Sequence, residues 1–395
     1  MDNDFETVIL SACRTPIGAF GGVFKEVSAV DLGAIVIREA VARAGVKPAD
    51  VGDVVMGCVL QAGAGMNVAR QAGLKAGLPV DVPGETVNRV CGSGMQAVVH
   101  AVEAIRVGYV DTIVAGGTES MSNAPYLLTG ARWGYRMGNA EVVDSMLHEG
   151  LTCAIGQTHM GITAEEVASR YNVSRSDQDA FAAESQRRAV GAMSEGRFKA
   201  EIVPVSIPQK KGEPLIVDRD EYPRPGTTVE KLAALKPVFD PEGTTTAGNA
   251  PGVNDGASCV IVCSEEWARK RGLEPLATIV GQGYVADDFA YLARTPAKAG
   301  AMALDRAGKT IDDVKRVEIN EAFSSVALNS TRMLGADEAV VNVNGGAVAL
   351  GHPIGASGGR IVGTMVHELR RNGGGLGLAA ICSGGGQGDA LLIEV

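Results

Sequence analysis

The chain has 395 residues, 46% of them hydrophobic and 21% charged, which is enough apolar material for a large core and, at roughly 150 residues each, for two to three domains. Its formal net charge of -10, with no block of like charges, argues against nucleic acid or an anionic membrane surface as the main partner. No run approaches the roughly 18 apolar residues of a membrane span, no leader precedes Phe5, and the cysteine count of seven is odd, so we expect a reducing cytoplasm and no disulfide framework.

An internal repeat organises the predicted elements. Residues 40–57 and 303–320 align without a gap, and each segment reads as the end of a helix, an Ala-Gly stop, a polar connection and a strand. In both halves a glycine-rich turn into a helix, a strand and a final strand follow. Strands that alternate with helices indicate βαβ units and parallel sheet. The repeat therefore predicts two similar α/β halves packed as a pseudo-dimer.

A strand-to-helix turn carries the first candidate catalytic residue. A β-leaning run ends at Cys91, Gly92 and Gly94 turn the chain, and apolar residues then recur at helical spacing as far as Gly108. The N–H groups and dipole at a helix N-terminus stabilise a thiolate, so this position predicts a pKa below the usual value of about 8.5 for Cys91. A buried structural cysteine beside a tight turn is the alternative interpretation.

Only the first copy of the repeat is interrupted, by residues 118–249. The insert leaves from the carboxyl end of the strand predicted at 112–117, which is the edge where ligands bind in open α/β sheets. We expect two capped helices within it, one beginning at Thr163 and the other running from Ser174 to about Gly196. The insert is predicted to be a substrate lid or an oligomerisation arm, and one segment can serve as both.

His352 is the histidine best placed to partner Cys91. It lies in the glycine-rich turn of the second half, close to the place that Cys91 has in the first. If the halves face each other about a pseudo-two-fold axis, the two turns meet. A Cys–His pair is the minimal apparatus of covalent acyl transfer, because the imidazole takes the thiol proton. A structural histidine before a proline is the alternative.

Two further polar residues lie at equivalent strand ends. Asn320 occupies the position of Gly57 in the first copy, where an amide would orient water or an oxyanion. Cys382 stands where the first half has glycine, and a second thiol there would act as acid or base, or merely pack. Cys259 and Cys263 have no histidine or second cysteine pair nearby, so we expect core thiols and no metal site.

Several glycine-rich signatures resemble the thiolase family, and especially its short-chain biosynthetic type. In chain order they are CGSGMQAV, HMG followed by TAE, TAGNAPGVNDGA, NEAF, GGAVALGHPIGASG and CSGGGQG, and the likeness covers essentially the whole chain from ILSACRTPIGAFGG onward. It implies an α/β thiolase-like fold of two duplicated βαβ-type halves with mixed five-stranded sheets, packed as a pseudo-dimer. The N-terminal half would comprise residues 1–117 and 250–271, and the C-terminal half 272–395. The loop domain, 118–249, would bind CoA and support oligomerisation.

The resemblance also implies a reaction, the reversible Claisen condensation of two acetyl-CoA molecules to acetoacetyl-CoA and CoA. These thioesters would be the substrates, with no metal or other cofactor, and the enzyme would be a homo-oligomer, expected to be a tetramer. Cys91 would carry the acetyl group with His352 as its base, and Cys382 would move the α-carbon proton of the second acetyl-CoA. His352 and a water held by Asn320 would stabilise the enolate oxygen, and the N–H groups of Cys91 and Gly384 would form a second oxyanion hole.

The family positions that contact CoA carry over mainly to the insert. They are Leu151, His159, Met160, Arg224, Phe239, Ala247, Ala322 and Phe323. Arg224 would meet the adenine-nucleotide end, and Met160 and Phe239 would narrow the acyl pocket. Two departures concern the CoA-binding loops: Pro251 replaces the usual serine before NDGA, and residues 293–296 read Ala-Arg-Thr-Pro in place of Gly-Thr-Gly-Pro.

Three other functions compete with this interpretation. A 3-ketoacyl-CoA thiolase of broader chain length would cleave longer ketoacyl-CoAs instead of acetoacetyl-CoA. A condensing enzyme that uses acyl carrier protein would usually carry two histidines in place of Asn320 and Cys382. A nucleotide-binding loop at Gly308-Lys309-Thr310 would need a glycine at Ala303 and a preceding strand, whereas a helix is predicted there.

Overall fold

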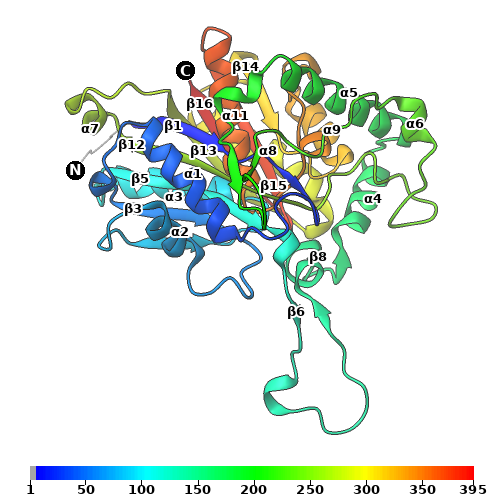
Figure 1. Ribbon diagram of the computed structural model, residues 1–395. Helices are drawn as coiled ribbons and strands as arrows, with labels where there is room; N and C mark the ends of the chain where they lie inside the picture. Colours follow the sequence, from blue (N-terminus) through cyan, green and yellow to red (C-terminus); the bar gives the residue numbers. More distant parts are fainter. Residues whose placement is uncertain (1–5) are drawn as a thin grey trace.

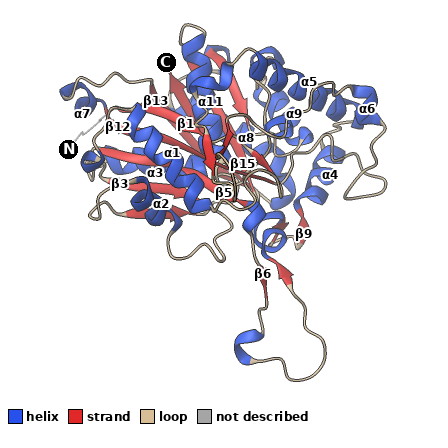
Figure 2. Ribbon diagram, in the orientation of Figure 1, coloured by secondary structure: helices blue, strands red, loops and turns tan. Residues whose placement is uncertain are grey.

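The computed structural model describes residues 6–395, and the expectation about a leader before Phe5 lies outside them. Two α/β units share one mixed sheet, and helices and hairpins from the middle of the chain gather at one side of it (Figures 1 and 2). No helix in this range has the length and apolar character needed to cross a membrane.

The first unit draws its strands from both sides of the insert. Its elements are β1 (Thr7–Arg14), β2 (Gly18–Ala19), α1 (Ala29–Arg43), β3 (Asp53–Gly57), α2 (Val68–Ala76), β4 (Gly84–Val87), α3 (Ser93–Arg106), β5 (Thr112–Ser120), β12 (Asn254–Ser264) and α7 (Glu265–Lys270). Strand β5 continues past residue 117 and is buried along its whole length, and β12 pairs with it from end to end. The insert therefore leaves the sheet from Ser120.

The second unit repeats the first. Its elements are β13 (Ala277–Ala286), α8 (Thr295–Arg306), β14 (Val314–Ile319), α9 (Ser324–Leu334), α10 (Ala347–Leu350), α11 (Ser357–Arg371), β15 (Leu376–Ser383) and β16 (Gln387–Glu394). Helices α1 and α8 end at Arg43 and Arg306, two positions that the gapless alignment pairs. A short 3-10 helix follows each, at Pro48–Asp50 and Ile311–Asp313. The sequence repeat is therefore a structural repeat.

The two units join edge to edge in one sheet. The strand order is β4-β3-β5-β12-β1-β13-β16-β15-β14. Pairing is parallel along β4-β3-β5 and between β14 and β15, and antiparallel elsewhere, so the sheet is mixed where alternation with helices alone suggested a parallel one. Strands β1 and β13 meet at the centre, where Thr7 to Ile9 pair with residues 277–279.

The second unit has four strands and a remnant of the expected fifth. At that position only Val341 forms a parallel bridge to Val317. Asn342 then has a φ of 46° and leaves the strand. Its amide takes over the pairing, because Oδ1 accepts the N–H of Ile319 and Nδ2 donates to the Ile319 carbonyl, both at 2.8 Å. One side chain satisfies backbone groups that a neighbouring strand would otherwise bind.

Helices α3 and α11 lie in the middle of the protein and form one buried apolar cluster with the inner face of the sheet. Met95 and Val98 of α3 meet Ile361 and Met365 of α11 there. Helices α1 and α2 cover the opposite face of the first unit, and α8 covers that of the second. The N-termini of the two central helices are thus held against each other by the core.

Most elements of the insert lie at the right and bottom of Figure 1, whereas Val205 and Val217 pack in the apolar cluster of the first unit. The insert comprises β6 (Tyr126–Leu127), β7 (Val143–Asp144), a π-helix (Met146–Leu151), β8 (Thr152–Cys153), β9 (Thr158–His159), α4 (Met160–Arg170), α5 (Arg175–Ser194), β10 (Val205–Ile207), β11 (Leu215–Val217) and α6 (Val229–Ala233). Helix α5 has the predicted cap, with Ser174 and Asp177 forming a capping box.

The expected start of the other insert helix at Thr163 is wrong. Helix α4 begins at Met160, because His159 is its N-cap and accepts the Gly161 N–H at Nδ1, 3.0 Å away. The π-helix of residues 146–151 precedes it in the chain. An imidazole cap of this kind is outside the usual Ser, Thr, Asp and Asn set, which explains why the sequence pattern missed it.

The hairpin made by β6 and β7 projects from the body of the protein (Figure 1). Its loop exposes large apolar side chains, including Trp133 at 86% and Met137 at 99%. Tyr126 and Tyr135 on the same hairpin are also exposed. Large apolar side chains exposed together on one hairpin are typical of a protein–protein contact.

Candidate active site

The two glycine-rich turns meet, as the repeat predicted. Gly92 is the N-cap of α3 and directly follows Cys91, while α11 begins five residues after His352. A β-carbon placed on Gly94 would lie 2.8 Å from the carbonyl oxygen of Gly355 and 2.9 Å from the Gly359 nitrogen. Backbone thus packs on backbone, and only glycine leaves room for it.

A cavity of about 280 Å³ opens at this junction and holds all three predicted reactive side chains. Cys91 comes from the first unit, and His352 and Cys382 come from the second. The wall is almost entirely apolar. It also includes Met121, Met146, Leu147, Gly150, Leu151, His159, Met160, Phe239, Pro251, Leu292, Ala322 and Phe323. Gly384 lines it as well.

The expected lowering of the Cys91 pKa is wrong for this site. The protein packed around the thiol raises its pKa from 9.0 to about 12, even though part of the residue faces the cavity. The backbone N–H groups of Cys91 itself and of Gly384 act in the opposite direction, because they favour negative charge on the sulfur. Desolvation disfavours the thiolate more strongly than the helix terminus favours it.

The His352 imidazole is neutral at physiological pH. Burial lowers its pKa from 6.5 to about 3, and the nearby Arg360 charge adds to the shift. Nδ1 lies 2.7 Å from the Ser357 hydroxyl, which in turn donates to the Pro353 carbonyl at 3.0 Å. A hydroxyl has one proton, so it accepts from an Nδ1–H. The lone pair of Nε2 is then free, and this nitrogen has no partner among the described residues.

Cys382 and Asn320 are both buried. Burial, and then the proximity of Cys91, raise the pKa of the Cys382 thiol well above 9.0, so it is a thiol at neutral pH. Asn320 follows β14, and its backbone N–H donates to Ala380 at 2.9 Å. Both polar atoms of its side-chain amide lack a partner among the described residues. A buried amide without partners is costly, and a bound water or ligand atom would satisfy it.

Six of the eight predicted CoA contacts line the cavity: Leu151, His159, Met160, Phe239, Ala322 and Phe323. The rings of His159 and Phe239 stack with centroids 4.8 Å apart, and Phe323 meets Phe239 edge-on. Arg224 and Ala247 are not in the wall. The Arg224 guanidinium lies over the Tyr222 ring at 5.2 Å.

The two departures from the family pattern differ in their effect. Pro251 lines the cavity. Residues 293–296, in contrast, turn into the start of α8 and do not reach the wall. There Arg294 pairs with Asp287 at 2.5 Å, and the Thr295 hydroxyl donates to the Gln387 carbonyl at 2.7 Å.

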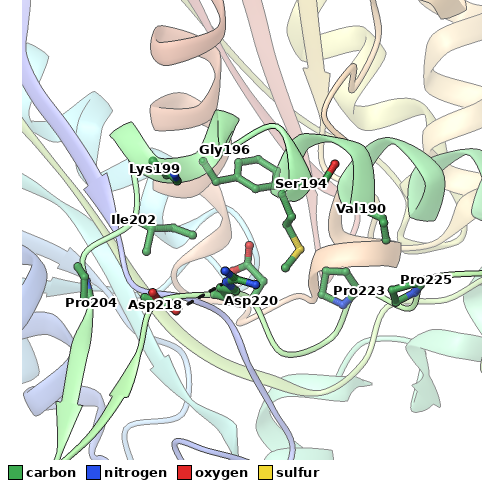
Figure 3. A pocket seen from close by; sticks show the side chains of 13 residues that line it. Val190, Ser194, Gly196, Lys199, Ile202, Pro204, Asp218, Asp220, Pro223 and Pro225 are labelled. Atoms are coloured by element: carbon green, nitrogen blue, oxygen red, sulfur yellow. Dashed lines mark ion pairs between the residues drawn. The ribbon is translucent and has the colours of Figure 1, made fainter.

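A larger cavity of about 570 Å³ lies beneath the C-terminal end of α5 (Figure 3). Pro223 and Pro225 line it, together with Lys199, Asp218 and Asp220. None of the predicted catalytic or CoA-binding residues contributes to it.

Sequence reasoning missed the buried polar groups that hold the turns. Glu119 accepts the backbone N–H of Gly355, and Ser383 accepts that of Gly92, each at 2.8 Å. Both residues lie at the ends of predicted apolar strands. A polar residue in that position was the only sequence signal for their role. Ser357, which hydrogen-bonds the imidazole, lies in the glycine-rich stretch after His352, and no sequence pattern singles it out.

The thiolase N-terminal domain family matches residues 7–266 and the thiolase C-terminal domain family matches 273–395. A duplicated α/β fold with this cysteine-bearing cavity is that of a thiolase-type acyltransferase. The chain belongs to the thiolase family.

The chain is similar to relatives of known name over nearly its whole length. It is 50% identical to an acetyl-CoA acetyltransferase of Chromobacterium violaceum over 389 residues, which is 98% of this chain and 99% of the relative. One from Cupriavidus necator has the same identity and coverage. The crystal structure of the Bacillus anthracis acetyl-CoA acetyltransferase matches with a TM-score of 0.97 at 42% identity, covering 100% of both chains.

Proposed function

We propose that this chain is an acetyl-CoA C-acetyltransferase, which joins two acetyl-CoA molecules to acetoacetyl-CoA and CoA and also catalyses the reverse thiolysis. The proposal rests on one observation: the side chains of Cys91, His352 and Cys382 line the same apolar cavity. Relatives about 50% identical to this chain are named acetyl-CoA acetyltransferases, which supports acetyl-CoA as the substrate.

In the first half-reaction Cys91 attacks the thioester carbon of acetyl-CoA, and CoA leaves. Burial penalises both the Cys91 thiolate and the His352 imidazolium. The proton therefore moves from sulfur to Nε2 while the carbon–sulfur bond forms, and it then passes to the departing CoA sulfur. The N–H groups of Cys91 and Gly384, which already favour negative charge at the sulfur, would bind the developing oxyanion.

In the second half-reaction the Cys382 thiol first gives its proton to Nε2 of His352, and the resulting thiolate takes a proton from the α-carbon of a second acetyl-CoA. The carbanion attacks acetyl-Cys91, and the imidazolium returns its proton to the Cys91 sulfur as that sulfur leaves. A protonated thiol at rest also suits the reverse direction, in which Cys382 gives its proton to the leaving carbanion. Asn320 does not line the cavity, so its buried, unpartnered amide supports a role through a water that it would hold for the enolate oxygen, and not through direct contact with substrate. Each step uses side-chain or backbone groups of this chain.

Cavity size favours short acyl groups. Met160 and the stacked His159–Phe239 pair narrow a space of about 280 Å³ that must also admit the pantetheine arm. The test is to incubate the enzyme with CoA and either acetoacetyl-CoA or a longer 3-ketoacyl-CoA and to follow loss of the 3-ketothioester. Efficient cleavage of acetoacetyl-CoA is expected. Cleavage of only the longer substrates would overturn the acetyl specificity, and the alternative of a broader 3-ketoacyl-CoA thiolase would replace it.

Residues 118–249 are proposed to serve both CoA binding and assembly. The exposed Trp133, Tyr135 and Met137 on the projecting hairpin support contact between copies, and a tetramer is the expected assembly. Sedimentation should give a mass of four chains; a mass of one or two would refute the tetramer.

The catalytic thiol has to stay reduced, which supports action in the cytoplasm. Cell fractionation tests this.

A further inference from the structure

The strands in the middle of each unit end in a buried polar residue. Glu119 lies at the end of β5, and Ser383 is the last residue of β15. Both side chains are buried. The parallel β3–β5 and β14–β15 ladders place the two residues at equivalent levels of the repeat. Neither residue has a role in the reaction described above.

Ser383 reaches from the second unit into the turn that carries the nucleophile. Its hydroxyl oxygen accepts the backbone N–H of Gly92 at 2.8 Å, one residue after Cys91. A β-carbon on Gly92 would lie 2.5 Å from that oxygen, so the approach requires glycine. Close by, Arg89 of the first unit pairs with Asp389 of the second at 3.0 Å. The Cys91 turn is therefore anchored on both sides by the other unit.

Glu119 reaches in the opposite direction. Its carboxylate accepts the N–H of Gly355 at 2.8 Å, three residues after His352. It also accepts the N–H groups of Val59 and Leu60 at 3.0 Å, which ties this contact to its own unit. A β-carbon on Gly355 would lie 2.6 Å from the carboxylate. Each unit thus holds the other's turn through one backbone N–H.

We propose that Glu119 and Ser383 are positioning residues that form a reciprocal cross-brace, in which Ser383 places Cys91 and Glu119 places His352. Each brace residue reaches the opposite turn through a backbone N–H next to a reactive residue, and neither lines the cavity. The brace therefore governs the distance and orientation of the thiol and imidazole without touching substrate. The change in kcat that we expect rests on the proposed function, whereas the change in the reactivity of the Cys91 thiol does not.

The central experiment compares Ser383→Ala with Ser383→Thr, which keeps the hydroxyl, and with Ser11→Ala. Ser11 is an equally buried serine whose hydroxyl donates to the Ala40 carbonyl at 2.7 Å, away from both turns. Since small displacements of reacting groups cost up to about a hundredfold in rate, we expect Ser383→Ala to lose about ten- to a hundredfold in kcat, with KM changed less than about twofold. Ser383→Thr should restore most of the rate.

Alkylation of Cys91 by iodoacetamide supplies a readout that needs no CoA thioester. Peptide mass spectrometry at one fixed pH gives the rate at this residue. Ser383→Ala and Glu119→Gln should each slow it at least about fivefold, because the thiol and its base no longer align. Ser11→Ala, and Glu201→Gln as a buried carboxyl control paired with Arg14, should stay within about twofold of the parent.

The outcomes separate the two proposals. If Ser383→Ala and Glu119→Gln, folded by circular dichroism, keep the parent's kcat and alkylation rate, the cross-brace is refuted. It is also refuted if Ser11→Ala slows both rates as much as Ser383→Ala does, since the effect would then be general destabilisation. If Cys91 is alkylated more slowly in both brace variants, but the parent enzyme does not cleave acetoacetyl-CoA, the proposed function fails while the cross-brace stands.

Discussion

Replacing Ser357 with alanine tests how His352 becomes a base. The hydroxyl of Ser357 is committed to the Pro353 carbonyl, so it favours the tautomer with the proton on Nδ1 and leaves Nε2 free for the Cys91 proton. Without it, the Nδ1–H has no partner in a buried site, and the opposite tautomer, with its proton on Nε2, gains population. That tautomer cannot accept the thiol proton.

The size of the effect follows from the strength of one buried hydrogen bond. Leaving a buried donor unpaired costs about 1–2 kcal/mol, which corresponds to roughly a 5- to 30-fold loss in kcat. KM should stay close to the parent value, because Ser357 does not line the cavity. Steady-state thiolysis of acetoacetyl-CoA measures both, with Ser11→Ala as the control for loss of a buried hydroxyl. An unchanged kcat in Ser357→Ala would refute the tautomer argument, as would an equal loss in Ser11→Ala.

Three other changes test separate parts of the site. Cys382→Ser should still form acetyl-Cys91, seen as a mass increase after acetyl-CoA is added, while condensation falls by orders of magnitude; equal loss of both half-reactions would contradict its role. Burial raises the pKa of Glu119 from 4.5 to about 7. The folded protein then keeps a proton that the unfolded chain loses, so raising the pH across this window lowers stability by up to about 3 kcal/mol, and in urea unfolding Glu119→Gln should lack this part of the pH dependence. Gly94→Ala should cost about 1–3 kcal/mol because its β-carbon meets the Gly355 backbone, whereas Gly191→Ala in α5, with open space around it, should gain about 0.5–1 kcal/mol; melting temperatures that rank the other way would refute the packing argument.

Most of the fold that could be predicted from the sequence was predicted from the internal repeat. Two segments aligned without a gap were enough to infer two facing units, and from that symmetry to bring Cys91 and His352 together from opposite halves of the chain. Local patterns also located the α5 capping box and the turn before α3. These features depend on residues close in sequence or on a symmetry visible within it.

What sequence reasoning missed depends on tertiary surroundings. A helix terminus suggested a low pKa for Cys91, but burial by segments from both units outweighs it. The missing fifth strand of the second unit reflects the amide of Asn342, a single side chain whose pairing no periodicity reveals. Glu119 and Ser383 escaped notice because their partners are backbone N–H groups in the other unit, more than two hundred residues away.

The position of β1 sets the order in which this protein is built. Its neighbour β12 begins at Asn254 and pairs Ser264 with Thr7, and its other neighbour, β13, follows. During synthesis the first strand must therefore wait, unpaired, until most of the polypeptide has left the ribosome. Non-local pairing of this kind closes slowly and leaves apolar edges open to aggregation in the meantime. The whole insert is translated during that wait, so the seam between the units, and with it a working cavity, forms only near the end of synthesis.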